Sequence, residues 1–191
     1  QPTEDEDNNK SDSESDYCSS STSDTTMKRV FGTSKLAHRV SFQDVLLGSK
    51  NKSSSSSSSS ADASSNNNRR WCCMIYATQN GWKLPILFEE LGIEYDWCLV
   101  DFEQNQQRSP EFLQINPNGR IPALIDREKN VTVAESGAIL EYVCEEVGDT
   151  SLFPSKAQSL QLHLQCKQWL YWQVSGQGPM LGQSMYFNRI A

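Results

Sequence analysis

Residues 118–126, NGRIPALID, decide the fold because they place a proline at the start of an apolar run. Ile121, Leu124 and Ile125 are typical of a buried strand, yet Pro122 has no N–H to donate to a neighbouring strand. Two interpretations fit this stretch by itself. Pro122 is either an ordinary edge-strand proline or a cis proline that turns the backbone of Ile121 outward at the start of a strand.

The segments on both sides of this stretch alternate between strand and helix patterns. Strands are expected at residues 71–77, 93–101, 120–126 and 131–134, and helices at 81–92, 108–117 and 135–148. Pro85 lies near the first turn of the first helix, Gly92 ends it, and Asn80 is placed to cap it. A strand-helix-strand unit implies a parallel pair, and the last two strands imply an antiparallel hairpin. The order βαβ-α-ββα therefore predicts an α/β, thioredoxin-like domain with a mixed four-stranded sheet and helices on its faces.

The composition divides the chain into three parts. Residues 1–70 hold most of the serine and a dense acidic run. The low-complexity stretches 1–24 and 50–70 have too few apolar side chains to offset the entropy of ordering, whereas residues 27–47 have enough for a docking segment but not for a domain. We predict that residues 1–70 form a disordered, Ser-rich, acidic tail. Residues 71–149 are the predicted thioredoxin-like domain. Residues 150–191 are expected to form a linker and the first helices of an all-α domain, with a kink or break at residues 176–183. Because that domain begins without finishing, we expect the sequence to be a fragment.

Composition and spacing also argue against several classes of function. The formal net charge is -7, and nucleic-acid binding needs clustered Lys and Arg. No apolar run is long enough for a membrane span, and the first residues are acidic rather than the basic start of a signal peptide. No pair of cysteines has CxxC or zinc-ligand spacing, so no metal site is expected. Buried, reduced thiols are the favoured interpretation, and they indicate a reducing compartment, the cytoplasm. The six cysteines are Cys18, Cys72, Cys73, Cys98, Cys144 and Cys166.

One short motif lies within the predicted tail. Arg39, Val40, Ser41 and Phe42 spell RVSF, which resembles the motif by which regulatory subunits dock on type-1 protein phosphatase. Four residues are a weak signal. The favoured alternative is a few hydrophobic residues in a solvated tail.

The start of the helix at residues 135–148 carries a candidate binding site. Ser136 lies where a helix N-cap belongs, and the free N–H groups and positive dipole end there favour a carboxylate. Glu135 beside it can accept a hydrogen bond from an ammonium group. Together they suit the γ-glutamyl end of glutathione, which carries both charges on one carbon. A serine cap with a neighbouring Glu is common in any helix, so the pair is informative mainly through its spacing from Pro122.

Four motifs in order, TQNGWK, PEFLQINPNGRIPALID, AESGAILEYV and WLYWQVSGQGPMLGQ, resemble the glutathione transferase family. Within it they are most similar to the nu class and to the subfamily of the yeast nitrogen-regulatory prion protein. The resemblance covers residues 71–188 and leaves out the tail. It implies a thioredoxin-like N-terminal domain followed by an all-α domain, and a homodimer.

The resemblance also implies roles for individual residues. It assigns the stabilisation of the glutathione thiolate to Thr78 and Asn80, in a turn without the Tyr, Ser or Cys that other transferase classes use. Gln79 stands where proline is common in the family, so this turn departs from the family pattern. The implied glutathione contacts are Gln107, Arg120, Ile121, Pro122, Glu135 and Ser136.

A stabilised thiolate limits the chemistry to two reactions. Lowering a thiol pKa of about 8.5 by about two units, roughly 2.7 kcal/mol, makes thiolate the main form near pH 7. One or two charge-assisted hydrogen bonds of about 1.5–3 kcal/mol each can supply this without a general base. The thiolate can attack an electrophilic carbon, as in a transferase, or a disulfide, as in a disulfide-bond oxidoreductase. Glutathione is then the co-substrate that carries the redox sulfur. The alternative is a non-catalytic regulatory or interaction protein, with a tail that docks on type-1 protein phosphatase through Arg39, Val40 and Phe42.

Overall fold

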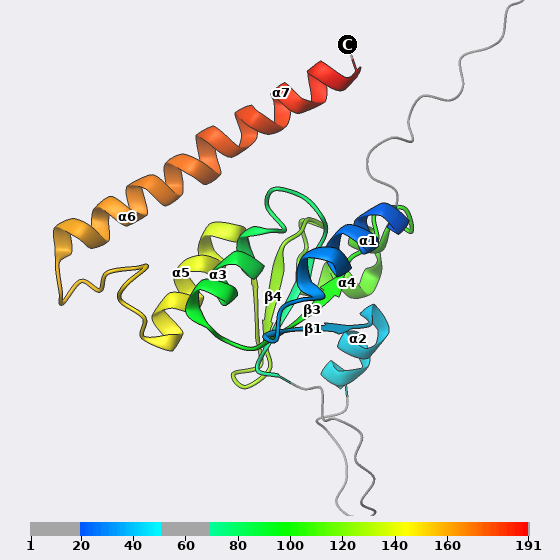
Figure 1. Ribbon diagram of the computed structural model, residues 1–191, viewed down its shortest axis with the longest axis horizontal. Coiled ribbons are helices and arrows are strands. Elements are labelled where there is room, and N and C mark those ends of the chain that lie inside the picture. Colours follow the sequence, from blue (N-terminus) through cyan, green and yellow to red (C-terminus); the bar gives the residue numbers. More distant parts are fainter. Residues whose placement is uncertain (1–19, 51–68, 191) are drawn as a thin grey trace, which may run out of the picture.

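The computed structural model describes residues 20–50 and 69–190, which build a mixed sheet covered by helices (Figure 1). The strands are β1 (Ala37–Val40), β2 (Trp71–Ile75), β3 (Tyr95–Leu99), β4 (Ala123–Asp126) and β5 (Val131–Ala134). Their order in space is β1-β3-β2-β4-β5. β3 runs parallel to β1 and β2, whereas β4 runs antiparallel to β2 and β5. Strands β2 to β5 confirm the predicted thioredoxin-like mixed sheet, and β1 adds a fifth strand that was not predicted.

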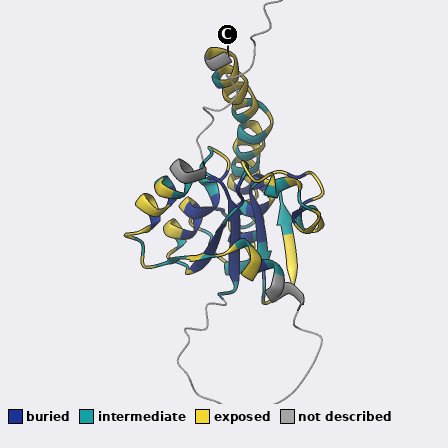
Figure 2. Cartoon of the chain, turned by 90° about the vertical axis from the view of Figure 1, so that its right-hand side faces the viewer, coloured by how far each residue is buried: buried dark blue, intermediate teal, exposed yellow. Residues whose placement is uncertain are grey.

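Helices cover both faces of the sheet. One face carries α1 (Ser20–Phe31), α3 (Lys83–Leu91) and α5 (Ser136–Val147), and the other carries α2 (Phe42–Lys50) and α4 (Pro110–Ile115), with the short η2 (Gln106–Arg108) before α4. Alternate side chains of a strand point to opposite faces. In β2, Trp71, Cys73 and Ile75 pack on the first face and Cys72 and Met74 on the second, so every position is buried (Figure 2). This double burial explains the continuous apolar run that predicted the strand.

Residues 20–50 correct the expectation of a disordered tail, because they form α1, β1 and α2 and pack on the domain. Met27 and Phe31 are buried on one face of the sheet, and Val45 is buried on the other. The ring of Phe31 lies 5.3 Å from that of Trp97 in β3, centroid to centroid. The segment has too few apolar residues for a core of its own. It folds by adding them to a core that the rest of the chain provides.

The RVSF motif belongs to this folded segment. Arg39 and Val40 lie in β1 and pair with β3. Val40 and Phe42 are partly buried against the core beneath α2, so the interpretation of hydrophobic residues in a solvated tail does not hold for them. The rest of the predicted tail, residues 1–19 and 51–68, lies outside the described residues.

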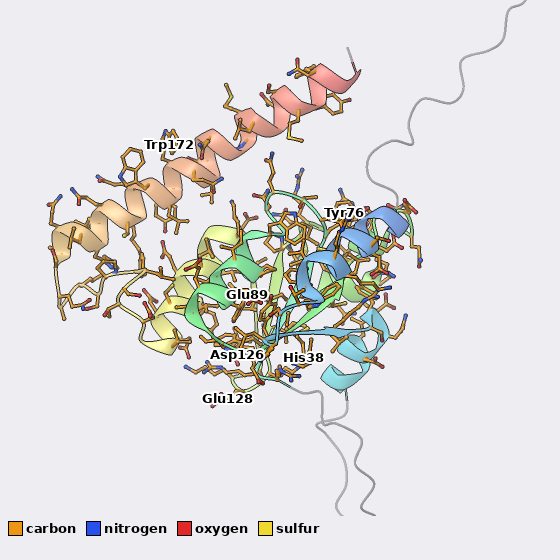
Figure 3. All side chains as sticks on the ribbon, in the orientation of Figure 1. His38, Tyr76, Glu89, Asp126, Glu128 and Trp172 are labelled. Carbon is orange, nitrogen blue, oxygen red and sulfur yellow. The ribbon has the colours of Figure 1, made fainter. Side chains whose placement is uncertain are left out.

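The C-terminal part forms one long helical rod beside the sheet domain (Figure 1). It consists of α6 (Leu160–Trp172), the π-helical turn η3 (Gln173–Gln177) and α7 (Gly178–Ile190). The prediction of a kink or break at residues 176–183 is wrong, because α7 is helical through Pro179. The irregularity lies mostly before that range, in the wide turn η3, where the Gly178 N–H donates to the Gln173 carbonyl. Large apolar side chains are exposed along the rod, among them Trp172, labelled in Figure 3. Within the described ranges, no helix is both long and apolar enough to cross a membrane.

Candidate functional site

A cleft of about 470 Å³ lies where β2 ends, at the end of the sheet marked by Tyr76 in Figure 3. The structure brings all eight candidate site residues from the sequence into its lining. They are Thr78, Asn80, Gln107, Arg120, Ile121, Pro122, Glu135 and Ser136. Four separate segments of the chain supply them, so the fold and not local sequence assembles the cleft.

The turn between β2 and α3 holds Thr78 and Asn80 at the cleft. The Thr78 hydroxyl accepts a hydrogen bond from the Gly81 N–H at 3.2 Å. Gly81 is required here, since a Cβ at this position would lie 2.0 Å from the Tyr76 carbonyl oxygen. The prediction that Asn80 caps α3 is wrong, because the N-cap is Trp82 and makes no side-chain cap bond. The Asn80 amide has no hydrogen-bond partner within residues 20–50 and 69–190, so it is available to a ligand.

The Ile121–Pro122 peptide bond is cis, which decides between the two interpretations of this proline. Pro122 also precedes a strand that lies between two others, so it is not an edge-strand proline. The buried Asn116 holds the loop in front of it, with its side-chain amide donating to the Arg120 carbonyl at 2.6 Å. Neither the N–H nor the C=O of Ile121 has a hydrogen-bond partner in the part of the chain that the structure describes. Both groups are therefore free to pair with an extended peptide.

The start of α5 differs by one residue from the sequence-based expectation. Glu135 is the N-cap, with φ 70°, and Ser136 is the first helical residue rather than the cap. A positive φ is uncommon for a residue other than glycine and is often found at ligand sites. The first helical bond runs from the Ile139 N–H to the Glu135 carbonyl, and the Glu135 carboxylate caps nothing. The first N–H groups of α5 thus remain unpaired at the cleft, where they and the helix dipole favour an anion.

Gln107 and Arg120 also line the cleft. The Gln107 side-chain N–H donates to the Asn105 side chain at 3.2 Å, while its Oε1 is buried and lacks a partner among the described residues. A buried acceptor without a partner is costly, so a ligand donor at this oxygen would be stabilising. Arg120 is exposed and lines the cleft with its side chain free of ion pairs to the described residues.

Four lining residues were not found from the sequence: Phe102, Arg108, Asn116 and Gly119. Phe102 stacks on Tyr76 with ring centroids 4.3 Å apart. Gly119 has φ 61°, and a Cβ there would lie 2.8 Å from the Gln107 carbonyl oxygen. Asn116 and Gly119 belong to an NPNG turn, whose composition is a signal that could have identified them. Nothing in the sequence pattern singles out Phe102 or Arg108.

A second cavity, of about 790 Å³, adjoins the cleft and shares Thr78, Asn80, Arg120, Glu135 and Ser136 with it. Its far wall comes from the helical rod: Val174, Gly178, Pro179, Gly182, Met185 and Tyr186. Gln79, the departure from the family pattern, donates from its side chain to the Met185 sulfur at 2.9 Å. The rod therefore completes a space that opens onto the same turn as the first cleft.

The cysteines of the described residues lie outside the cleft and are free thiols. Burial raises the pKa of Cys72 to about 12 and that of Cys144 to about 11. Burial likewise raises the pKa of Cys73 and Cys98 well above the ordinary value. A thiolate at this site must consequently come from a ligand. Over residues 20–50 and 69–190, no group of His, Cys, Asp and Glu side chains could hold a metal ion.

Residues 75–145 match the family described as glutathione S-transferase, N-terminal domain. Protein URE2 of Candida maltosa is 41% identical over 117 residues, which are 59% of this chain and 35% of that protein. The disulfide-bond oxidoreductase YfcG of Escherichia coli is 40% identical over 119 residues, 60% of this chain and 53% of that protein. The chain thus spans between about a third and about half of the length of these relatives.

Solved structures of a glutathione transferase and of Ure2p are also similar to this chain. The glutathione transferase URE2P8 from Phanerochaete chrysosporium, solved with oxidized glutathione, has a TM-score of 0.60 and 34% identity, covering 66% of this chain and 57% of that one. Ure2p in complex with glutathione has a TM-score of 0.59 and 36% identity, covering 64% and 56%. The likeness to these structures is therefore one of sequence as well as of fold.

Proposed function

We propose that the cleft binds glutathione, because residues 75–145 match the glutathione S-transferase N-terminal domain family and the chain is similar to Ure2 proteins. The chain would then use the bound thiolate as a glutathione transferase or a disulfide-bond oxidoreductase. The observation that carries the proposal is the assembly of all eight candidate residues around a cis proline and the free start of α5. In this proposal residues 71–149 are the glutathione-binding domain, and residues 150–191 are a linker and the first helices of an all-α domain.

The charges and free backbone groups of the cleft suit the three parts of glutathione. Its γ-glutamyl carboxylate would accept hydrogen bonds from the start of α5, including the Ser136 hydroxyl, and Glu135 would accept from its ammonium group. The cysteinyl backbone would pair with the N–H and C=O of Ile121 beside Pro122. Gln107 would meet the glycyl end through its unpaired oxygen, with Arg120 nearby.

Thr78 and Asn80 would stabilise the sulfur as a thiolate. The Thr78 oxygen already accepts from the Gly81 N–H, which leaves its O–H free to donate, and Asn80 has two N–H donors. Two such bonds to an anion, at about 1.5–3 kcal/mol each, suffice for a fall of about two pKa units. No base is required for this step.

Disulfide reduction is the reaction that we favour. The glutathione thiolate attacks one sulfur of the substrate disulfide, a mixed disulfide forms, and the second sulfur leaves as a thiolate. A second glutathione thiolate then releases the first product sulfur and forms glutathione disulfide, so two glutathiones are oxidised for each disulfide reduced. The similarity to a disulfide-bond oxidoreductase supports this choice, and the buried protein thiols leave the redox sulfur to glutathione. Transfer to an electrophilic carbon uses the same thiolate.

The test is turnover of glutathione with a small disulfide, bis(2-hydroxyethyl) disulfide, by the purified chain. The Thr78→Ala, Asn80→Ala double variant should lose about 10- to 100-fold in rate if one charge-assisted hydrogen bond or more is removed. Thr132→Ala, at an exposed position of β5, is the matched control and should turn over like the wild type. Equal rates for the double variant and the wild type, or no turnover by either, would contradict the proposal.

A regulatory or interaction protein with the same fold is the second candidate. Similarity to the transcriptional regulator URE2 of Saccharomyces cerevisiae, 40% identical over 117 residues and covering 59% of this chain and 32% of that protein, supports it. Docking on type-1 protein phosphatase would have to detach β1, because Val40 and Phe42 pack inward. A pulldown that recovers no phosphatase with either the wild type or Phe42→Ala would exclude docking on type-1 protein phosphatase.

Two further properties are part of the proposal. We expect a homodimer, which sedimentation of the purified chain would test. We also expect a reducing compartment, the cytoplasm, because the described cysteines are free and mostly buried.

A further inference from the structure

Lys83 places a cation at the junction of three elements beside the cleft. Its ammonium nitrogen lies 3.1 Å from the Ser136 hydroxyl oxygen at the start of α5 and 2.6 Å from the Gln173 side-chain oxygen in η3. Both neighbours are uncharged acceptors. Lys83 forms no ion pair with a carboxylate in the part of the chain that the structure describes.

A partly buried cation without an anion is unfavourable unless a ligand supplies one. Burial lowers the pKa of Lys83, and no neighbouring carboxylate counteracts this. Lys83 lines the second cavity, and Ser136, which it contacts, lines both that cavity and the cleft. The charge therefore lies where a bound anion would reach it, at the same helix start that already presents free N–H groups.

The hydrogen bond from Lys83 also orients the Ser136 hydroxyl. A hydroxyl has one hydrogen to donate and two lone pairs to accept with. Since Lys83 occupies a lone pair of Ser136, the hydroxyl hydrogen is left to point toward another acceptor. Gln173 fixes Lys83 from the other side, and it does so from a π-helical turn, a feature frequent at functional sites.

We propose that Lys83 is a positioning residue for the γ-glutamyl carboxylate, which it attracts by charge and presents with an oriented Ser136 hydroxyl. This inference rests on the proposed glutathione binding. It adds a residue outside the predicted set, and it makes η3 of the helical rod a part of the binding apparatus through Gln173.

The test compares glutathione with an analogue that lacks only this carboxylate, 4-aminobutyryl-cysteinyl-glycine, by calorimetric titration of the full chain. Lys83→Met should raise the Kd for glutathione by about 10- to 100-fold, as expected for a charge-assisted hydrogen bond. The same substitution should change the Kd for the analogue by less than about two-fold, because the carboxylate it acts on is absent. Lys83→Arg, which keeps the charge, should recover most of the lost affinity.

Two variants separate this role from a structural one. Lys83→Gln keeps a neutral N–H donor on a shorter side chain and removes the charge, so it should weaken glutathione binding. Lys167→Met is the matched control. Lys167 bridges α6 to Glu141 of α5 at 3.0 Å, joining the rod to the same helix outside the cleft, and its loss should leave both Kd values unchanged.

The outcomes are distinct. Equal weakening of glutathione and the analogue by Lys83→Met, or unchanged glutathione binding by Lys83→Gln, would overturn the role of Lys83 while leaving glutathione binding intact. A wild-type chain that binds neither compound would instead refute the proposed function, and the inference with it.

Discussion

Replacing Phe31 by alanine should release residues 20–50 from the sheet while the rest of the domain stays folded. Phe31 is 6% exposed and packs on Trp82, Trp97 and Tyr95, with ring centroids 5.5, 5.3 and 6.4 Å away. A buried Phe→Ala substitution costs about 3–5 kcal/mol, part of it from the cavity that remains. The variant therefore removes the largest apolar anchor of the segment.

The remaining anchors are too few to compensate. Among the side chains of this segment that the structure describes, Met27 and Val45 are the other buried apolar ones and contribute about 1.5–3 kcal/mol each, and Val40 and Phe42 add partial burial, against the entropy of ordering the segment. The net free energy that holds the segment on the sheet is thus comparable to the free energy that Phe31→Ala removes. Local opening is expected before global unfolding, since strands β2 to β5 keep their pairing with one another when β1 leaves β3.

Hydrogen exchange measured by mass spectrometry reports this opening directly. Amides of α1 and β1 in Phe31→Ala should exchange roughly 100-fold faster, while those of β2 keep their protection. Val30→Ala, one residue earlier and 51% exposed, is the matched control and should exchange like the wild type. Unchanged protection of β1, or equal loss of protection in β2, would refute the reasoning. The second result would mean that the segment and the domain unfold as one unit.

Three further predictions concern the ion network, the cleft loop and the thiols. Asp126→Asn should destabilise the fold by about 3 kcal/mol, because it breaks a buried, two-point ion pair with Arg70 at 2.7 Å. Burial alone would raise the pKa of Asp126, but hydrogen bonds, chiefly from Arg70, lower it below its ordinary value. The stabilisation that Asp126 contributes is therefore complete above the unfolded pKa of about 3.9 and is lost as the pH falls below that value. Urea midpoints between about pH 5 and about pH 3 should accordingly fall more steeply for the wild type than for Asp126→Asn; parallel curves would contradict this. Gly119→Ala should weaken glutathione binding and cost roughly 1–2 kcal/mol of stability, as φ 61° disfavours any Cβ, whereas Gly176→Ala, with open space around it, should not destabilise. Finally, iodoacetamide at about pH 8 should leave Cys72 unmodified in the native chain, because its pKa of about 12 keeps it protonated; rapid labelling at that position would show that the core opens.

The sequence predicted the elements whose pattern is local and failed where the pattern depends on the rest of the fold. The fully apolar run of β2 and the Gly92 stop of α3 are both local signals, and both were confirmed. β1 has no such pattern, because its four residues are only partly buried or exposed and their strand conformation depends on pairing with β3. Propensity is a weak guide when a neighbouring strand decides the structure.

The candidate site divides in the same way. The cis bond before Pro122 could be anticipated because a strand with a proline at its start permits few arrangements. The capping roles were misplaced for a different reason. The positive φ of Glu135 moves the start of α5 by one residue, and Trp82 replaces Asn80 before α3. In both cases the polar side chain, Glu135 or Asn80, lines the cleft and does not cap a helix. Capping rules describe what stabilises a helix, so they cannot predict a side chain that is placed for a ligand.

The polar groups at one end of the sheet are paired with one another, whereas those at the other end are left unpaired. We therefore expect the first end to contribute to stability and the second to ligand binding. At the end labelled by Asp126 and Glu128 in Figure 3, the Asp126 carboxylate accepts from Arg70, Tyr142 and two backbone N–H groups, so its charge is fully paired. At the Tyr76 end, the Ile121 backbone and the start of α5 stay unpaired among the described residues, so a ligand that pairs with them would stabilise the folded chain. Substitutions at Asp126 should thus lower the free energy of unfolding and leave the Kd for glutathione unchanged. Substitution of Asn80, exposed and without a side-chain partner within the described residues, should do the reverse. A variant at either end that moved both quantities together would show that the two ends are coupled through the sheet.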